Sequence, residues 1–381
     1  MIYYGKQSVN EDDIRAVAEV LRSPLITQGP EVERFERRVA DYCGAKYAVA
    51  VTSATAALHI ACRAADLGEG DELWTSPITF VASANCGLYC GAKVDFADVD
   101  ADTYNISADA LQKKLEAGGR PKVVVPVHLC GQSCDMERVG ELSKEYGFTV
   151  IEDASHALGA TYKGTKVGSC AYSDMAVFSF HPVKIITAGE GGMVLTNRKD
   201  LYEKLEILRT HAVTRNPALM THEPDGEWYY QQIDLGYNYR MTDFQAALGN
   251  SQMNRLDKFV ARRRELARRY DEAFRGLPLK RPYQNPDTNS SWHLYVVRVD
   301  FQKAGLTKGE LFVKMRERGV QLNVHYIPVH TQPYYKSLGF NRGDFPVSEK
   351  YYDEAFTLPI YYDLTDAEQD TVISALRDAL S

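Results

Sequence analysis

Short apolar runs alternate with helical patterns in the first half of the chain, and this alternation restricts the fold more than any other feature. Three runs rich in valine, at 47–52, 122–127 and 148–153, have the length and composition of buried strands. Between them, apolar residues recur at helical spacing before a glycine or turn, over 53–65 and 135–147. Buried strands that alternate with helices are typical of a parallel sheet covered on both faces. The sequence therefore predicts an α/β fold with a mostly parallel central sheet.

The length of the chain leaves room for a second domain. Its 381 residues, 45% hydrophobic and 25% charged, can bury a large core. Region 212–237 lacks periodicity and predicts a long loop, and loops of that length are uncommon unless they have a function. Beyond it, helical segments, one strand and a C-terminal helix near 366–379 predict a smaller α+β unit. We predict a large domain over 1–245 and a small domain over 246–381.

Charge and hydropathy exclude two classes of partner. The net charge of −7 gives no general basic surface for nucleic acid, and the R-R-R cluster at 262–264 reads as a solvated helix face. The sequence has no run of 18 or more apolar residues, so no membrane segment is predicted. The first ten residues lack the pattern of a signal peptide. These features favour a cytoplasmic protein.

Cysteine spacing raises the question of a metal. Cys86 and Cys90 are four residues apart, as are Cys130 and Cys134, among seven cysteines in all. Zinc sites favour a C-x-x-C spacing, whereas C-G-L-Y-C reads as one turn of an apolar helix. We interpret these residues as reduced, structural thiols and predict no metal site.

The turn after the first strand separates two large classes of α/β enzyme. A nicotinamide-binding fold requires G-x-G-x-x-G here, and the chain has T-S-A-T-A-A-L instead. Thr52, Ser53 and Thr55 open a helix whose free N–H groups suit a phosphate monoester. Serine and threonine are also routine helix N-caps, so the turn alone leaves both interpretations open.

An acidic residue ends another predicted strand. In E-D-A-S-H-A-L-G, Asp153 stands at the carboxyl end of the run 148–153, where open α/β sheets bind their ligands. His156 follows three residues later, within reach of the same cleft. Taken singly, Asp153 also fits a helix cap or loop residue, and His156 a structural histidine.

Lys184 lies in F-S-F-H-P-V-K-I-I-T-A-G-E-G-G, among apolar residues and just before glycines that permit close backbone approach. A nucleophilic lysine must lose its proton near neutral pH, and apolar neighbours lower its pKa from the exposed value of about 10.4. A single lysine is ordinarily a surface residue. Helix-opening hydroxyls, Asp153 and Lys184 together are the parts that hold pyridoxal phosphate: a phosphate cup, a partner for the pyridine nitrogen and an amine for the aldehyde.

Five motifs carry a family resemblance. T-S-A-T-A-A-L, P-I-T-F-V-A-S-A-N, E-D-A-S-H-A-L-G, the Lys184 motif and G-Y-N-Y-R-M-T-D resemble, in order, those of the fold type I nucleotide-sugar aminotransferases named for DegT, DnrJ, EryC1 and StrS. The resemblance runs from the N-terminal Y-Y-G to H-Y-I-P-V-H near 330. S-A-T-x-A-L, S-H-A-L-G and V-H-Y-x-P are most similar to the pseudaminic acid branch, the UDP-4-amino-4,6-dideoxy-N-acetyl-β-L-altrosamine transaminases.

The resemblance implies a role for each matching residue. Lys184 would bind the cofactor and Asp153 would contact its pyridine nitrogen. The other cofactor contacts it implies are Phe80 on the ring, His156 near the ring face or its 3-hydroxyl, and Ala54, Thr55 and Ser179 at the phosphate. Asn238 would reach the phosphate in the partner subunit of a homodimer with shared active sites. The nucleotide sugar would lie against Tyr4, Thr27, His325, Tyr326 and His330.

The implied reaction moves an amino group from L-glutamate to C4 of a UDP-4-keto-6-deoxy-N-acetylhexosamine, with Lys184 as general base. In the pseudaminic branch this sugar is UDP-2-acetamido-2,6-dideoxy-β-L-arabino-hex-4-ulose. His156 departs from the glutamine common elsewhere in the family, but the pseudaminic branch also carries histidine there. Two alternatives stay open: a UDP-, dTDP- or GDP-4-keto sugar of bacillosamine, perosamine or aminoarabinose type, and a non-catalytic sugar-binding relative.

Overall fold

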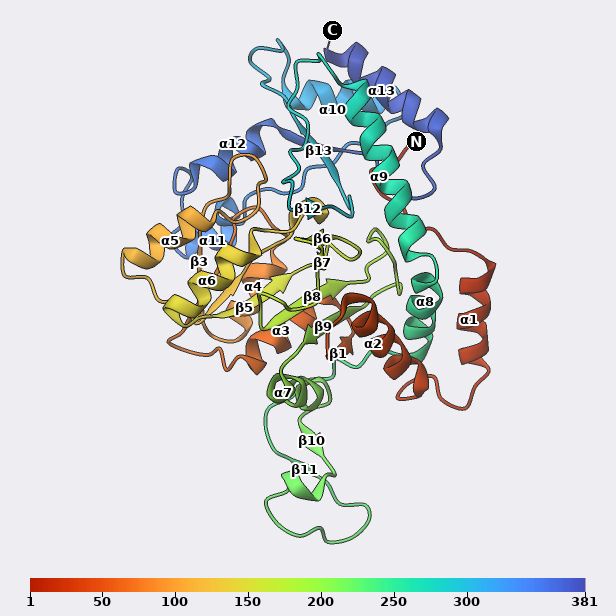
Figure 1. Cartoon of the computed structure of the whole chain (residues 1–381), viewed down its shortest axis with the longest axis vertical. Helices are drawn as coiled ribbons and strands as arrows, with labels where there is room; N and C mark the ends of the chain where they lie inside the picture. Colours follow the sequence, from red (N-terminus) through yellow and green to blue (C-terminus); the bar gives the residue numbers. More distant parts are fainter. Residues whose placement is uncertain (381) are drawn as a thin grey trace.

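A seven-stranded sheet forms the centre of the computed structural model, which describes residues 1–380 (Figure 1). Its strand order is β1-β9-β8-β5-β4-β2-β3. The bounds are β1 Tyr47–Val51, β2 Glu72–Thr75, β3 Lys93–Phe96, β4 Val123–Val125, β5 Thr149–Asp153, β8 Met175–Ser179 and β9 Gly192–Thr196. β9 runs antiparallel to both of its neighbours, and the other pairs are parallel. The α/β fold with a mostly parallel sheet is therefore confirmed.

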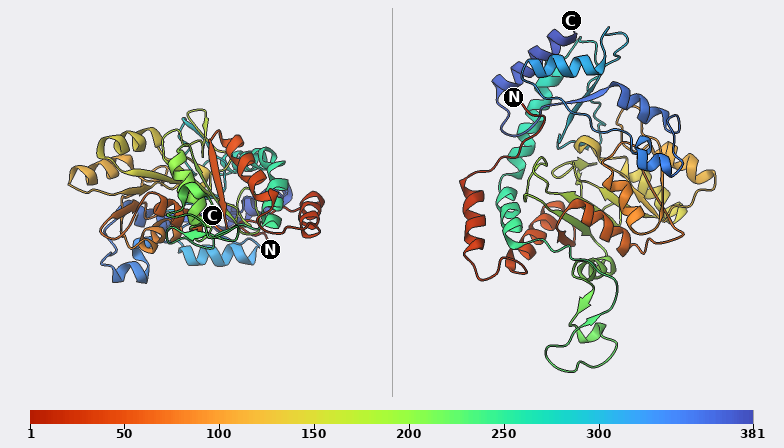
Figure 2. Two further views of the ribbon diagram at one scale, coloured as in Figure 1. Left: turned by 90° about the horizontal axis from the view of Figure 1, so that it is seen from below. Right: turned by 180° about the vertical axis from the view of Figure 1, so that it is seen from behind.

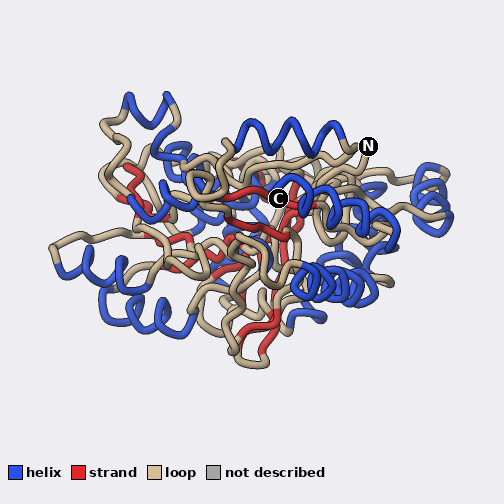
Figure 3. The backbone as a smooth tube through the Cα atoms, turned by 90° about the horizontal axis from the view of Figure 1, so that it is seen from above, coloured by secondary structure: helices blue, strands red, loops and turns tan. Residues whose placement is uncertain are grey.

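Alternate strand residues point to opposite faces of the sheet. Since both faces carry apolar side chains, helices cover both of them. On β4, Val123 and Val125 pack into the core beneath α3 (Ala54–Ala64), α4 (Ala82–Tyr89) and α7 (Lys199–Arg209), whereas Val124 packs on the other face. The opposite face is covered by α2 (Pro30–Cys43), α5 (Ala108–Glu116) and α6 (Met136–Tyr146). Seen from above, the strands lie among surrounding helices (Figure 3).

The C-terminal part has a core of its own. The long helix α9 (Leu256–Ala273) links the two regions: Phe259 packs in the core below the central sheet, and Tyr270 packs in the second core. That core lies around the pair β13–β14, with bounds β13 Tyr295–Arg298, β14 Ala355–Leu358, α10 Lys308–Glu317 and α13 Asp366–Leu380. The domain boundary at 245/246 stays a prediction.

The region predicted as a long loop contains a short antiparallel pair, β10 (Val213–Thr214) and β11 (Gln231–Gln232). This hairpin extends away from the body of the molecule in Figure 1 and in the rear view of Figure 2. The remaining elements are α1 Glu11–Leu21, α8 Asp243–Met253, α11 Pro333–Ser337, α12 Pro346–Glu354, β6 Thr161–Tyr162, β7 Thr165–Lys166, β12 Thr288–Asn289, and the 3₁₀ turns η1 Leu129–Gly131, η2 Pro217–Leu219 and η3 Val329–Thr331. Within residues 1–380, no helix combines the length and apolarity that crossing a membrane requires.

Candidate active site

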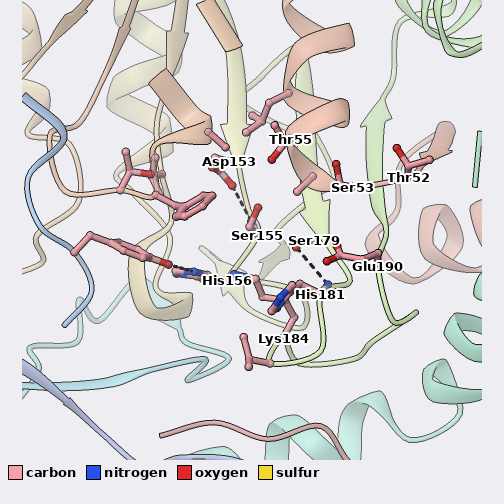
Figure 4. A pocket seen from close by; sticks show the side chains of 18 of the residues that line it. Thr52, Ser53, Thr55, Asp153, Ser155, His156, Ser179, His181, Lys184 and Glu190 are labelled. Carbon is pink, nitrogen blue, oxygen red and sulfur yellow. Dashed lines mark hydrogen bonds between the residues drawn. The ribbon is translucent and has the colours of Figure 1, made fainter. Parts of the chain in front are cut away.

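Three strand ends open on one cavity of about 590 Å³. β1, β5 and β8 run in the same direction, so their carboxyl ends meet at one edge of the sheet. Figure 4 shows the resulting arrangement, with Ser53 and Thr55 at the start of α3, Asp153 at the end of β5 and Lys184 on the turn after β8. The structure thus brings together residues that lie 130 positions apart in the sequence.

The start of α3 is the candidate phosphate cup. Ser53 has an extended backbone and caps the helix, since its hydroxyl accepts a hydrogen bond of 3.1 Å from the N–H of Ala56. The N–H groups of Ala54 and Thr55 are in the first turn and have no partner within the helix. Gly192 lets β9 come close, because a Cβ there would lie 2.3 Å from the carbonyl oxygen of Ser53. The capping and anion-binding interpretations of this turn are therefore compatible.

Asp153 is buried and held by two donors. The hydroxyl of Ser83, on α4, donates to Oδ2 over 2.6 Å, and the N–H of Ser155 donates to Oδ1 over 3.1 Å. The Ser83 hydroxyl also lies 2.7 Å from that of Thr79, which lines the cavity. These two hydrogen bonds fix the orientation of the carboxylate. Asp153 is therefore held as a hydrogen-bond or ion-pair partner for a group in the cavity.

Lys184 is partly buried on the turn that follows β8, and its N–H donates to the carbonyl of His181. Burial lowers the pKa of its amine to about 8, and the charge of Asp153 opposes this change only in part. The shift has the direction that apolar neighbours predict. A substantial fraction of the amine is neutral near physiological pH, as a nucleophile or base requires.

Two buried histidines lie side by side at the cavity: His156 lines it, and His293 packs against His156. His156 packs against His293 with ring centroids 4.4 Å apart, and its Nε2 lies 3.1 Å from the hydroxyl of Tyr326. Burial lowers the pKa of both rings well below the ordinary value; for His156, the charge of Lys184 adds to the effect. The Nδ1 atom of His156 is buried and has no hydrogen-bond partner among residues 1–380. His156 therefore presents a neutral ring with one nitrogen free for a ligand.

Aromatic side chains form the remaining wall. The ring of Phe80 is 58% exposed although it lines the cavity, and Tyr326 lies 6.2 Å from it between centroids. Tyr4, from the N-terminal segment, also lines the cavity. An exposed aromatic face beside a cup of N–H groups suits a planar, phosphorylated ring.

Four residues that the sequence predicted at the site do not line the cavity: Thr27, Asn238, His325 and His330. Thr27 is exposed and pairs with Thr242 through a backbone bridge. His325 is buried and its Nδ1 lies 2.8 Å from the hydroxyl of Thr357, although its ring contacts Tyr4. Asn238 forms a backbone bridge with Thr210 and does not line the cavity of its own chain.

His330 does not reach the cavity either. Its side chain is fully buried, its Nε2 lies 2.9 Å from a carboxylate oxygen of Glu349, and its ring packs on Phe345. This position corrects the expectation of a sugar contact, because solvent and ligand have no access to the ring.

The cavity also contains residues that sequence reasoning missed, namely Ser155, His181 and Glu190, and Ser83 behind Asp153. Ser83 belongs to P-I-T-F-V-A-S-A-N and His181 and Glu190 to the Lys184 motif, so both motifs indicated the region but not the individual contacts.

These residues fit pyridoxal phosphate. The first turn of α3 and Ser179 would hold a phosphate, Asp153 would pair with the pyridine nitrogen, and Lys184 would bind the aldehyde. Among the residues that line the cavity, His156 has an Nδ1 atom with no hydrogen-bond partner within residues 1–380, and Phe80 has an exposed ring. Both lie where the ring of the cofactor would be held.

Comparison with known proteins identifies the same chemistry. Residues 7–377 match the model of the DegT/DnrJ/EryC1/StrS aminotransferase family. The chain is 41% identical over 378 residues to the spore coat polysaccharide biosynthesis protein SpsC of Bacillus subtilis, covering 98% of this chain and 96% of SpsC. Among solved structures it is similar to PseC of Helicobacter pylori, described as an aminotransferase involved in the biosynthesis of pseudaminic acid, with TM-score 0.92, 31% identity and coverage of 100% and 99%.

A second similar protein has been solved in its PLP form. The chain superposes with TM-score 0.89 and 30% identity on the PLP form of Spr1654 from Streptococcus pneumoniae, described as a sugar aminotransferase, covering 99% and 98% of the two chains. The chain belongs to the DegT/DnrJ/EryC1/StrS aminotransferase family and is a sugar aminotransferase that depends on pyridoxal phosphate.

Proposed function

We propose that this enzyme transfers the amino group of L-glutamate to C4 of a UDP-4-keto-6-deoxy-N-acetylhexosamine in pseudaminic acid biosynthesis. The substrate in this proposal is UDP-2-acetamido-2,6-dideoxy-β-L-arabino-hex-4-ulose. The observation that carries the reaction is the meeting of Asp153, Lys184 and the α3 cup around one cavity. The likeness to PseC over the whole chain, together with His156, supports the choice of sugar.

Several residues at the cavity would hold the cofactor. Ala54, Thr55 and Ser179 bind the phosphate through N–H and hydroxyl groups. The carboxylate of Asp153 would pair with the pyridine nitrogen, and the donors Ser83 and Ser155 hold that carboxylate in place.

Lys184 performs the proton transfers. When bound, pyridoxal phosphate carries the amino group between donor and acceptor and takes up the electrons released at the reacting carbon. The Nζ atom of Lys184, with its pKa lowered to about 8 by burial, would act as the general base that takes the proton from the α carbon of the amino donor and as the acid that returns it. His156 stays neutral beside it, so the two groups do not repel each other during the transfer.

The sugar site and the assembly complete the proposal. Tyr4 and Tyr326 line the cavity and are the sugar contacts that its geometry supports, while roles for Thr27 and His325 stay predictions. A homodimer in which Asn238 reaches the phosphate in the partner subunit is consistent with the fact that Asn238 does not line the cavity of its own chain. We retain the cytoplasmic location as a prediction from the sequence.

A second candidate keeps the chemistry and changes the sugar. Members of the family that use 4-keto sugars of bacillosamine, perosamine or aminoarabinose type are the alternative that the resemblance leaves open. A non-catalytic sugar-binding role is disfavoured because Lys184 is retained and has a lowered pKa.

A substrate panel tests the proposal. Purified enzyme is incubated with L-glutamate and, separately, UDP-, dTDP- and GDP-linked 4-keto sugars, and each product is identified by NMR together with the 2-oxoglutarate formed. We expect one 4-amino sugar with UDP and the L-arabino configuration. Faster conversion of another keto sugar would mean that this other sugar is the substrate. If none of the sugars were converted, the proposed reaction would be contradicted.

A further inference from the structure

Asn238 lies on a short extended segment, residues 237–240, beside the first strand of the central sheet. A backbone bridge joins Asn238 to Thr210, which follows α7, and the N–H of Thr52 donates to the carbonyl of Tyr239 over 2.9 Å. The side chain of Asn238 is exposed, and no group within residues 1–380 hydrogen-bonds to it. The backbone of the segment is therefore fixed, whereas the amide of Asn238 is available to a group outside this chain.

The two tyrosines that flank Asn238 form a stack against α3. Successive side chains of an extended segment alternate in direction, so Tyr237 and Tyr239 share one side and Asn238 points to the other. The two tyrosine rings have centroids 5.0 Å apart and planes inclined by 12°. His59, on α3, lies 4.6 Å from the ring of Tyr237, and its Nδ1 lies 3.0 Å from the hydroxyl of Tyr239. His59 therefore contacts both neighbours of Asn238.

His59 belongs to the packing behind the site and not to the cavity itself. Its ring is 6% exposed and does not line the cavity, and its Nδ1 bonds to Tyr239. Burying a polar ring costs free energy, which hydrogen bonding offsets. An apolar side chain would fill the same space without that cost, so the contribution particular to His59 is the bond that orients Tyr239.

We propose that His59 is a positioning residue: through Tyr237 and Tyr239 it directs Asn238 toward the active site of the partner subunit. This inference rests on the proposed homodimer with shared sites and names the residue that makes the shared contact effective. α3 then serves two sites. Its first turn would hold the phosphate of its own chain, and His59, further along the helix, supports the residue that would hold the phosphate of the other.

Loss of a single hydroxyl tests the support. Tyr239→Phe should weaken the binding of pyridoxal phosphate by about threefold to tenfold, and His59→Leu, which also removes the imidazole, by at least about tenfold. Amide hydrogen exchange at residues 237–240, measured on cofactor-free protein, should become faster in both variants.

Tyr335→Phe is the matched control. It also removes a tyrosine hydroxyl hydrogen bond, of 2.7 Å to Asn85, and that bond has no contact with residues 237–240. Cofactor affinity and exchange at 237–240 should be unchanged in this variant. The same changes in Tyr335→Phe and Tyr239→Phe, or no change in Tyr239→Phe, would overturn the proposal.

Mixed dimers distinguish action across the interface from action within one chain. Chains with His59→Leu and with Lys184→Ala carry different affinity tags, are co-refolded, and are purified through both tags. The one site that keeps Lys184 then receives Asn238 from a chain with an intact His59. We expect this site to bind pyridoxal phosphate, followed by the absorbance of the lysine-bound cofactor, with the affinity of the unmodified enzyme. The weakened affinity of the His59→Leu homodimer would overturn the proposal, since His59 would then act on its own phosphate cup.

A second mixed dimer, of Asn238→Asp and Lys184→Ala chains, separates this failure from failure of the shared site. Normal cofactor affinity in the Asn238 dimer together with weakened affinity in the His59 dimer would remove the role of His59 alone. Weakened affinity in both would contradict the shared site and this inference with it. Tyr239→Phe replaces His59→Leu in the same comparison if the leucine variant does not fold.

Discussion

The hydroxyl of Ser83 donates a hydrogen bond of 2.6 Å to Oδ2 of Asp153, across 70 positions of sequence. The bond joins α4 to the end of β5 and orients the carboxylate toward the cavity. Because both side chains are buried, water cannot replace Ser83 as a donor without rearrangement. Ser83 is thus a positioning residue for Asp153, the proposed partner of the pyridine nitrogen.

Ser83→Ala should slow turnover by about tenfold. A hydrogen bond to a charged group contributes about 1.5–3 kcal/mol, and 1.4 kcal/mol in a barrier is a factor of ten in rate. Asp153→Asn, which removes the charge itself, should cost on the order of 10² or more. Steady-state kcat measures both effects. Ser76→Ala is the control, because that buried hydroxyl bonds to the carbonyl of Ile78; equal losses in the two serine variants would refute a specific role for Ser83.

Capture of the cofactor should follow the titration of Lys184. Burial lowers the pKa of this amine to about 8, so its reactive neutral form increases as pH rises through 8. We expect the rate at which cofactor-free protein captures pyridoxal phosphate, followed by absorbance, to increase from pH 6.5 and level off above pH 9. An increase that continues to pH 10.5 would mean an ordinary, solvated lysine.

Buried histidines should make the cofactor-free protein less stable as pH falls below about 6.5. Burial lowers the pKa of His156 and His293 well below their ordinary value and that of His325 to about 3. Below 6.5 the unfolded chain binds protons at these rings and the folded chain does not, so stability is full above that pH and is lost below it.

Each histidine contributes about 1.4 kcal/mol per pH unit, or about 4 kcal/mol for the three. Urea denaturation between pH 5 and 7 measures this slope. His293→Gln should reduce it by about a third, and an unchanged slope would show that His293 titrates normally.

Asn238 should act in the partner subunit. Lys184→Ala and Asn238→Asp are each expected to be nearly inactive, the second because it sets a negative charge against the cofactor phosphate. After unfolding and co-refolding in equal amounts, about half the dimers are mixed, and each mixed dimer has one intact site. Activity should therefore return to about a quarter of that of the unmodified enzyme. If Asn238 acted in its own chain, every site would keep one lesion and no activity would return.

The sheet was predictable because its strands are locally encoded. The valine-rich runs at 47–52 and 148–153 became β1 and β5 to within one residue at each end. The places of Asp153 and Lys184 were predictable for a related reason: Asp153 ends β5 and Lys184 lies in the turn after β8, so the direction of each strand determines which edge of the sheet the residue occupies.

Contacts between distant segments were not predictable in this way. Ser83 reaches Asp153 only because α4, which packs on β2 and β3, begins at the same edge of the sheet where β5 ends, and His293 meets His156 from the C-terminal part of the chain. His330 shows the opposite error, since its motif suggested a ligand contact and packing against Phe345 and Glu349 placed it in the core. Neither outcome has a signal in local periodicity.

The central claim is that Lys184 binds pyridoxal phosphate, and reductive mapping tests it most directly. Purified enzyme is loaded with the cofactor, reduced with borohydride and digested, and the labelled peptide is sequenced by mass spectrometry. The account predicts a single cofactor adduct on Lys184, its loss together with the yellow colour in Lys184→Ala, and its retention in Lys303→Ala, where the lysine is exposed on the surface. An adduct on any other lysine of the unmodified enzyme, or none at all, would contradict it.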